Sequence, residues 1–382
     1  MRFTLPLLAT AATLILAPAA LADTTVSVEG GNTLYVRDTP SLFDARMDVV
    51  VTRSGTSFEV TDAVGNVHAK APCVLSGGAV KCPANTVTKA RLQGGTKNDV
   101  ISLETALPAT WYGDKGDDEL NGGPARDVFQ FEPGRDEIDG RDGIDEVTYA
   151  DADAGIALSL ANSSAFNDGR PNDPDRVLNV ENATGSAFED TIVGSVLDNL
   201  LSGTAGLDTL RGGNGDDILR GNEGDDNLRG EAGNDLLVGD DGDDHLDGGA
   251  DDDDVNGQNG DDTFVGDAGA DSYNGGSGRN TLDYSARTDG VTVTLDSGAP
   301  DDGGPADGNA DDANAIQDLF GTSGPDILTG AFGTNLLEGG PGDDELHVRD
   351  NFADTADCGP GQDGVEFDLG LDLTPNCEVI LP

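Results

Sequence analysis

Basic and aromatic residues are scarce in this sequence. Lysine and arginine together number 21 against 73 aspartates and glutamates, so the formal net charge is -52, and aromatic residues make up only 5% of the chain. A surface with this charge repels nucleic acid, and the apolar content is thin for a large conventional core. The carboxylates must be offset either by water and monovalent salt around a disordered chain, or by a hard divalent cation that takes oxygen ligands.

Catalytic motifs are also missing. The only histidines are His68, His245 and His347, and the sequence contains neither an H-E-x-x-H zinc motif nor a G-x-S-x-G nucleophile elbow. Neighbouring carboxylates such as Asp216 and Asp217 recur regularly, which favours metal ligands and turn charges over a general acid and base. We therefore expect no enzyme. The alternative is an unrecognised active site within residues 23–93, with the remainder as an accessory region.

The first 22 residues have the features of an export signal. A positive start is followed by an apolar run to Ala20, and a small-x-small cleavage pattern ends at Ala22. We expect residues 1–22 to be removed and the protein to be secreted, although the run approaches membrane-spanning length and an uncleaved anchor is the alternative. The rest of the sequence has no second apolar run of 18 residues, so we expect no membrane span after cleavage.

The four cysteines lie as two close pairs, Cys73 with Cys82 and Cys358 with Cys377. Four cysteines allow three pairings, and the two local bonds close the shortest loops at the lowest entropic cost. We expect these two disulfides, which suit an exported protein.

Glycine returns every nine residues from Gly185 to Gly275 and opens eleven successive nonapeptides without an insertion. A clear copy is GGNGDDILR at residues 212–220. Position eight is apolar in every copy, and position six is an acid or an amide. The position-six residues are Asp190, Asn199, Asp208, Asp217, Asp226, Asp235, Asp244, Asp253, Asp262, Asp271 and Asn280.

This spacing, with one large apolar residue in nine, fits neither an amphipathic helix nor an alternating strand. A coiled solenoid remains, in which glycines permit the turns and position-eight side chains stack inward. Residues 185–283 hold 25 Asp or Glu, 4 Arg and no Lys, so stacked turns would bring like charges together. The pattern therefore requires a cation, whereas a permanently disordered acidic chain leaves the apolar period unexplained.

The nonapeptide resembles the RTX, or haemolysin-type, calcium-binding repeat G-G-x-G-x-D-x-U-x. The resemblance implies an all-β fold, a right-handed parallel β-roll solenoid whose consecutive repeats alternate sides. It also implies that several Ca²⁺ ions are held between turns by position-six carboxylates and backbone carbonyls, while Asn199 and Asn280 depart from the motif. The ligands implied in this main block, residues 185–284, are Asp190, Asp208, Asp217, Asp226, Asp235, Asp244, Asp253, Asp262 and Asp271.

Two further blocks share the period. Residues 94–149 begin with an outlying copy at Gly94 and continue with four copies from Gly113, and residues 321–347 hold three copies, with Asn335 at one position six. The resemblance extends the calcium-ligand role to the position-six aspartates of both blocks. These are Asp118, Asp127, Asp136, Asp145, Asp326 and Asp344.

Segments without the period separate and flank the three blocks. The inserts 150–184 and 285–320 begin 135 residues apart and share a pattern, which indicates an ancient duplication and loops that leave one continuous solenoid. Residues 23–93 are rich in alternating β-formers and predict a small β cap at one end. Residues 348–382, with their cysteine pair, predict a disulfide-stapled cap at the other end.

These features favour a secreted, non-enzymatic calcium-binding protein that folds into a β-roll on binding extracellular Ca²⁺. Charge repulsion and the entropy of 55 glycines oppose folding without the ion. The alternative is a calcium-dependent adhesin at the cell surface or in a matrix, in which the two inserts contact the partner.

Overall fold

The structure is a computed structural model that describes residues 23–38, 46–64, 66–130, 132–161, 168–171, 173–295 and 311–381. The predicted signal segment, residues 1–22, lies outside the described residues, as do residues 162–167 and 296–310 of the two inserts. The described residues form strands and turns, which confirms the expected all-β class. Among them there is accordingly no helix that could cross a membrane.

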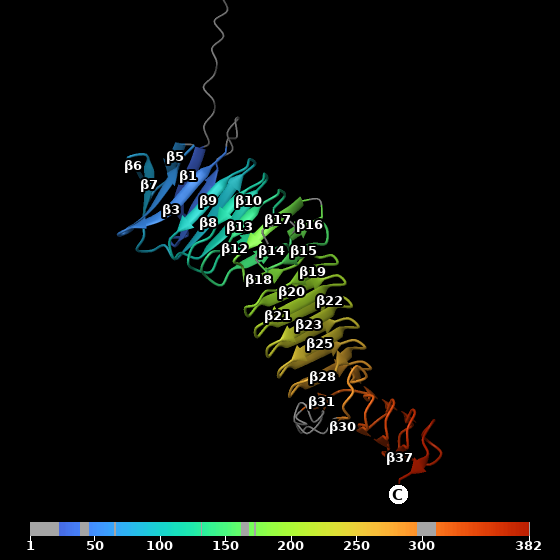
Figure 1. Ribbon diagram of the computed structural model, residues 1–382. Helices are drawn as coiled ribbons and strands as arrows, with labels where there is room; N and C mark the ends of the chain where they lie inside the picture. The colour runs from blue at the N-terminus through green and yellow to red at the C-terminus, as the bar shows by residue number, and fades with distance from the viewer. Residues whose placement is uncertain are drawn as a thin grey trace, which may run out of the picture.

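The molecule is an elongated parallel β-solenoid with an antiparallel unit at its N-terminal end (Figure 1). Successive strands of the main block alternate between two faces, and each strand pairs in parallel with the strand one coil later on the same face. Leu219 is in register with Leu237, and Leu237 with Val255. The expected parallel β-roll is therefore confirmed.

One face of the solenoid is a continuous 14-stranded sheet. In chain order it contains β1 (Asp23–Glu29), β2 (Thr33–Asp38), β5 (Asn66–Ala69), β8 (Lys89–Gly95), β10 (Ala109–Asp114), β12 (Val128–Gln130), β14 (Glu146–Thr148), β18 (Asn182–Thr184), β20 (Leu200–Ala205), β22 (Ile218–Glu223), β24 (Leu236–Asp241), β26 (Asp254–Asn259), β28 (Ser272–Ser277) and β31 (Asp312–Asn314).

The opposite face is built in two stretches that meet at the first insert. The first contains β3 (Asp48–Ser54), β4 (Ser57–Asp62), β6 (Val74–Ser76), β7 (Ala79–Pro83), β9 (Val100–Glu104), β11 (Glu119–Asn121), β13 (Glu137–Asp139) and β17 (Asp173–Leu178). The second contains β15 (Ala157–Ser159), β16 (Asp168–Arg170), β19 (Thr191–Val193), β21 (Thr209–Asn214), β23 (Asn227–Ala232), β25 (His245–Ala250), β27 (Thr263–Val265), β29 (Thr281–Asp283), β32 (Asp318–Phe320), β34 (Leu336–Glu338) and β36 (Thr355–Asp357).

The N-terminal unit continues directly into both faces. Hairpins β1–β2 and β3–β4 are antiparallel, whereas β2 pairs in parallel with β8 and β3 with β9. Buried residues such as Val26, Leu34 and Val49 line its interior. The predicted disulfide Cys73–Cys82 is formed within this unit.

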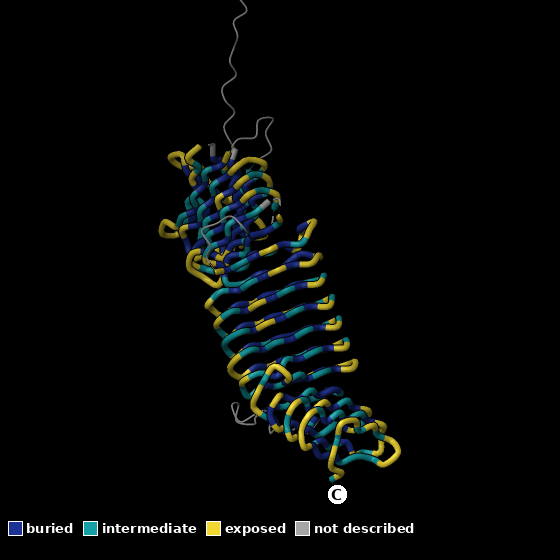
Figure 2. The backbone as a smooth tube through the Cα atoms, turned by 45° about the vertical axis from the view of Figure 1, so that its right-hand side comes forward, coloured by how far each residue is buried: buried dark blue, intermediate teal, exposed yellow. Residues whose placement is uncertain are grey.

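Position-eight side chains fill the space between the two faces, as the period predicted. Burying one such leucine contributes about 2 kcal/mol of transfer free energy, so the stack is the main apolar core of the repeats. Figure 2 shows the resulting buried stripes that follow each coil. The side chains that are 0% exposed are Ile192, Leu201, Leu210, Leu219, Leu228, Leu237, Leu246, Val255, Phe264 and Leu282.

Each insert exchanges one sheet for another. In the first, β17 pairs with β13 and ends one sheet, while β15, which comes earlier in the chain, pairs with β19 and begins the next. In the second, β31 pairs with β28, while the earlier strand β30 (Thr292–Thr294) pairs with β33 (Ile327–Thr329). The other face runs through unbroken each time, along β14–β18–β20 and then β29–β32–β34. The solenoid therefore passes through both inserts.

The C-terminal segment, residues 348–382, was predicted to be a disulfide-stapled cap, and its described strands pair with the last coils of the solenoid. Strand β36 pairs with β34, and β35 (Glu345–His347) pairs with β37 (Gly364–Glu366), which pairs with β38 (Val379–Ile380). The predicted disulfide Cys358–Cys377 is formed within these coils. Ala356 and Val365 are buried like the position-eight residues of the repeats.

Candidate metal site in the solenoid turns

All fifteen aspartates predicted as ligands lie inside turns and are at most 5% exposed. They are stacked, because the backbone N–H of one position-six residue donates to Oδ1 of the position-six aspartate one coil later. The nitrogen of Asp217 lies 2.7 Å from Oδ1 of Asp235, and the nitrogen of Asp235 lies 2.8 Å from Oδ1 of Asp253. We call these stacks aspartate ladders.

Four aspartate ladders run along the solenoid. The first contains Asp99, Asp118, Asp136 and Asp175. The second contains Asp127 and Asp145, is interrupted at Glu181, whose Oε2 accepts the N–H of Asp145, and continues with Asn199, Asp217, Asp235, Asp253, Asp271 and Asp311. The third contains Asp190, Asp208, Asp226, Asp244, Asp262 and Asn280, and beyond the second insert Asn335, Asp354 and Asp372. The fourth contains Asp326, Asp344 and Asp363.

The second carboxylate oxygen, Oδ2, distinguishes these side chains as candidate metal ligands. In ten of the predicted ligands this oxygen is buried and has no hydrogen-bond partner, an arrangement that is costly for a carboxylate unless a cation offsets it. We call the turns that contain them open turns. The ten residues are Asp118, Asp145, Asp208, Asp217, Asp226, Asp235, Asp244, Asp253, Asp262 and Asp344.

Position-one glycines keep space beside these oxygens. A Cβ atom on Gly221 would lie 2.2 Å from Oδ2 of Asp226 and 2.8 Å from the carbonyl oxygen of Gly239. A carboxylate oxygen and a backbone carbonyl therefore converge where only glycine leaves room. Oxygen donors of these two kinds are the ligands that Ca²⁺ takes, so the residues present fit this ion.

The ladder carboxyls have raised pKa values. Burial is the main cause, opposed by the backbone N–H that each carboxyl accepts, and nearby carboxylates raise the pKa further. The pKa rises to about 8 for Asp118 and Asp253, to about 7 for Asp208 and Asp217, and to about 6 for Asp226. The ionised ladder is therefore unfavourable until positive charge is brought to it.

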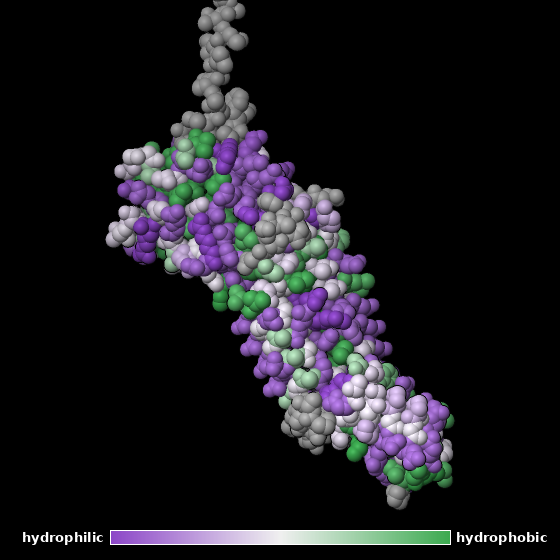
Figure 3. Space-filling view, in the orientation of Figure 1, coloured by the Kyte–Doolittle hydropathy of each residue, from purple (hydrophilic) through white to green (hydrophobic). Residues whose placement is uncertain are grey.

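Arginines of the main block pair with carboxylates on the outer surface. Arg211 forms an ion pair with Glu231, and Nη1 of Arg220 lies 3.3 Å from Oδ2 of Asp240. Both carboxylates belong to position two of their repeats. Hydrophilic side chains cover much of the solenoid surface that Figure 3 shows. These arginines thus offset the negative charge of carboxylates on the outer surface. The buried carboxylates of the ladders still require a cation.

Three predicted ligands lie in turns that close on their own carboxylate. Oδ2 of Asp127, Asp190 and Asp326 accepts a hydrogen bond from the position-two backbone N–H, at 2.7, 2.6 and 2.8 Å. The hydroxyls of Ser186 and Thr322 also donate to Asp190 and Asp326. We call these closed turns, because groups of the protein donate hydrogen bonds to Oδ2, which has no donor in the open turns.

A buried tyrosine ends a ladder at each insert. Oη of Tyr149 donates to Oδ2 of Asp175 at 2.9 Å, and Oη of Tyr284 donates to Oδ2 of Asp311 at 2.8 Å. Through Oδ1, both aspartates accept the backbone N–H of the preceding ladder member, Asp136 or Asp271. In these two turns a tyrosine hydroxyl therefore donates to Oδ2, whereas Oδ2 has no hydrogen-bond donor in the open turns.

The three asparagines that depart from the repeat motif contribute donors of their own. Nδ2 of Asn199, Asn280 and Asn335 donates to backbone carbonyls of the inserts at 2.6, 3.0 and 3.1 Å. These departures coincide with the insert joints, where protein hydrogen bonds link neighbouring coils.

Besides Asp372 at the end of the third ladder, five ladder aspartates were not among the predicted ligands: Asp99, Asp175, Asp311, Asp354 and Asp363. Asp99 is position six of the outlying copy at Gly94. Asp363 is position six of a copy that begins with cysteine, and Oδ2 of both Asp354 and Asp363 is buried without a partner. The shared signal is an aspartate two residues before a buried strand residue, which does not require an opening glycine.

Comparison with known families agrees with this geometry. A family model described as the RTX calcium-binding nonapeptide repeat (4 copies) matches residues 112–147, 184–219, 193–228, 220–255, 247–282 and 317–347. A search of curated proteins found no match. The matched residues include most of the ladder turns, so the chain contains RTX calcium-binding nonapeptide repeats across residues 112–347.

Proposed function

We propose that this protein is a secreted, non-enzymatic calcium-binding protein whose solenoid folds when Ca²⁺ binds in the open turns. The observation that supports this function is the row of buried Oδ2 atoms without a hydrogen-bond partner. Bound Ca²⁺ supplies positive charge and accepts oxygen ligands, which these turns offer.

The two oxygens of each open-turn aspartate have separate roles. Oδ1 joins one coil to the next through a backbone N–H, as between Asp208 and Asp226 at 2.7 Å. Oδ2 is left to hold the cation, together with backbone carbonyls such as that of Gly239 beside Asp226. Each ligand is therefore fixed by the same hydrogen bond that stacks the coils, so binding favours stacking.

Coupling of folding to the ion follows from charge. The chain has a net charge of -52, and burial places the ladder carboxylates away from water. The free energy of binding Ca²⁺ to the folded form alone is added to the free energy of folding.

Secretion is supported by the two disulfides, which form and persist in oxidising compartments. The export-signal pattern of residues 1–22 points the same way. A non-enzymatic role is supported by the position of the buried carboxylates. They recur in equivalent turns, where they accept hydrogen bonds that join neighbouring coils.

The test is a titration of Ca²⁺ into chelator-treated protein comprising residues 23–382, followed by calorimetry and far-ultraviolet circular dichroism. We expect several ions to bind with a gain of β signal. Mg²⁺ should bind weakly, since it demands near-ideal octahedral geometry and keeps its water. Absence of both heat and β gain with Ca²⁺ would contradict the proposed function.

A matched pair of variants locates the binding. Asp235→Asn removes a ladder charge and should lower the number or affinity of bound ions. Asp216→Asn removes a charge from an exposed neighbouring position of the repeat and should leave the titration close to that of the unmodified protein. Equal titrations for both variants would show that the ladders are not the ligands.

A further inference from the structure

The turn of residues 266–271 differs from most turns of the main block in its incoming strand and in its position-two side chain. Its incoming strand β27 ends at Val265, whereas β25 and β26 each run for six residues through the equivalent segment. Position two of this repeat is Asp267, and its Oδ2 accepts the backbone N–H of Gly249 at 2.7 Å. A side-chain oxygen thus joins this turn to the preceding coil on the same side.

The inward position of Asp267 brings three carboxylates together. Oxygens of Asp253, Asp267 and Asp271 all lie within 4.8 Å of one another, and among the described residues this is the one group of three such ligands. Asp253 and Asp271 are consecutive members of one ladder. The remaining turns of that ladder therefore lack a third carboxylate at this distance, as far as the structure describes them.

Two oxygens in this group lack hydrogen-bond partners. Oδ2 of Asp253 and Oδ1 of Asp267 are both buried without a donor, and Asp253 is only 4% exposed. Oδ2 of Asp271 accepts the hydroxyl of Tyr273 at 3.1 Å. The group therefore presents buried acceptor oxygens that hydrogen bonds do not satisfy, which is independent evidence that a cation belongs there.

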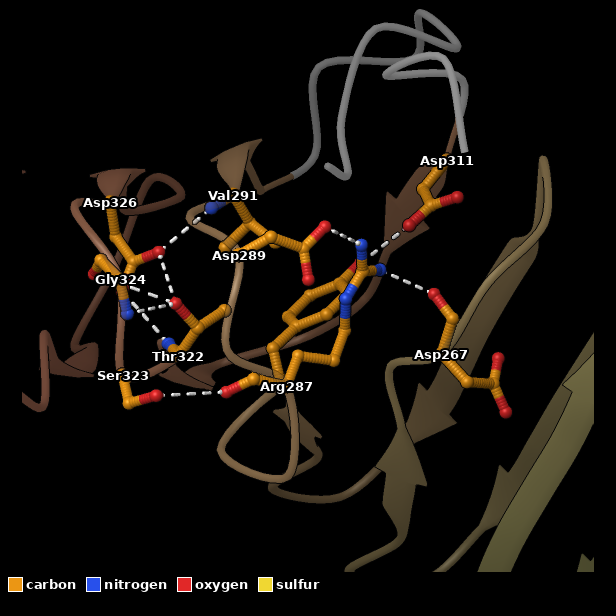
Figure 4. A network of polar contacts seen from close by, with 10 residues as sticks. Asp267, Arg287, Asp289, Val291, Asp311, Thr322, Ser323, Gly324 and Asp326 are labelled. Carbon is orange, nitrogen blue, oxygen red and sulfur yellow. Dashed lines mark hydrogen bonds and ion pairs between the residues drawn. The ribbon is translucent and has the colours of Figure 1, made fainter. Parts of the chain in front are cut away.

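Arg287 lies beside this turn and contacts the main chain of Asp267. Arg287 donates to the backbone carbonyl of Asp267, and its Nη2 pairs with Oδ2 of Asp289 at 3.1 Å. Figure 4 shows the carboxylate of Asp267 pointing away from this guanidinium. The guanidinium of Arg287 therefore interacts with the main chain of this turn and with the carboxylate of Asp289.

We infer that Asp267 is a third carboxylate ligand and that Asp253, Asp267 and Asp271 form the tightest cation site of the solenoid, filled before the remaining open turns. This inference rests on the proposed function and adds a specific order of filling. Ligand charge is one of the variables that set the affinity of oxygen sites for hard cations. With three carboxylates, the site should also take trivalent lanthanides.

The test uses Tb³⁺ as the probe, titrated into chelator-treated protein while tyrosine is excited and Tb³⁺ emission is recorded. Tyr273 contacts Asp271, so an ion in this site should be sensitised efficiently. We expect a first step at low Tb³⁺ concentration that Ca²⁺ displaces. Asp267→Asn should weaken that step by at least about tenfold, the lower end of what even indirect ligand contacts contribute.

In Asp267→Asn, the side-chain oxygen can still accept the N–H of Gly249. Asp267→Gly restores the glycine of the repeat motif at position two. Together the two variants separate loss of the ligand from misfolding. The control Asp240→Asn removes a charge from position two of another repeat, where the carboxylate faces Arg220, and should leave the first step unchanged. If both Asp267 variants titrate like the control while Ca²⁺ still binds, the inference is wrong and the proposed function stands. If the unmodified protein binds neither ion, the proposed function itself fails.

Discussion

At the scale of the residue, the open-turn aspartates combine two requirements that oppose each other. Oδ1 must be buried to accept a backbone N–H from the neighbouring coil, and this burial leaves Oδ2 without water. Desolvation penalises the ionised form, so without a cation the proton is retained well above the usual pKa of aspartate. A proton and a cation are then alternative ways to stabilise the same turn.

The folding of the cation-free protein should therefore weaken as the pH rises. Ladder pKa values lie at about 6 for Asp226 and about 8 for Asp253, above the ordinary value of 3.8. A raised pKa in the folded form stabilises that form below the ordinary pKa, and this contribution is lost as the pH rises through the raised value. In chelator-treated protein we expect more β signal at about pH 5 than at about pH 8 by circular dichroism.

With Ca²⁺ the pH dependence should reverse, because ligands must lose their protons before they bind metal. Affinity should rise between about pH 5 and pH 8, and binding should release protons that calorimetry in buffers of different ionisation enthalpy can count. The same β content at both pH values without Ca²⁺ would contradict the role of the raised pKa values.

At the scale of the element, the two inserts build equivalent joints. In each joint a buried tyrosine donates to the last aspartate of a ladder, as Tyr284 donates to Asp311 at 2.8 Å. The guanidinium of Arg287 lies over the ring of Tyr284, with Cζ 5.8 Å from the ring centre. The joints thus hold their coils with protein hydrogen bonds, whereas the repeats between them have open turns.

Tyr284→Phe should consequently destabilise the protein even in saturating Ca²⁺. The change removes the hydroxyl that donates to Oδ2 of the buried Asp311, and loss of such a hydrogen bond costs about 1–3 kcal/mol. Tyr149→Phe should act in the same way on Asp175, and thermal unfolding with excess Ca²⁺ measures both. The control is Tyr112→Phe, since Tyr112 is half-buried and lies under Arg91, away from the joints. Equal unfolding midpoints for all three variants would show that the tyrosine hydrogen bonds of the joints do not stabilise the protein.

At the scale of the whole molecule, the solenoid is an elongated rod (Figure 1), and its repeats place acidic residues in successive coils along its length. Each coil contacts its neighbours, so stability accumulates by local stacking along the rod. Repulsion among stacked carboxylates also accumulates along the rod, and bound cations reduce it at every open turn.

Removal of Ca²⁺ should therefore expand the chain. By small-angle X-ray scattering at neutral pH, we expect the radius of gyration to increase toward the about 70 Å of an unfolded chain of this length. Sodium chloride at matched ionic strength is the control, because it screens exposed charges without supplying ligands to buried oxygens. A radius that is unchanged by chelator would show that the rod is stable without the ion.

The repeating part of this protein could be predicted from its sequence. The nine-residue period places Leu219 and Leu237 inward and Asp217 and Asp235 in the turns, and such local periodicity is sufficient to predict a solenoid. The family model and the all-β solenoid confirm that interpretation. The disulfide pairs of the structure also follow from the short loops that they close.

The surroundings of each carboxylate, in contrast, depend on the folded structure. Asp190 and Asp208 occupy the same repeat position, yet Oδ2 of the first accepts a donor from its own turn and Oδ2 of the second has none. The tyrosine donors of Asp175 and Asp311 and the inward turn of Asp267 likewise depend on contacts between coils. A repeat motif describes one turn, whereas the partners of its oxygens come from neighbouring coils and from the inserts, whose strand exchange is not encoded in the nine-residue period.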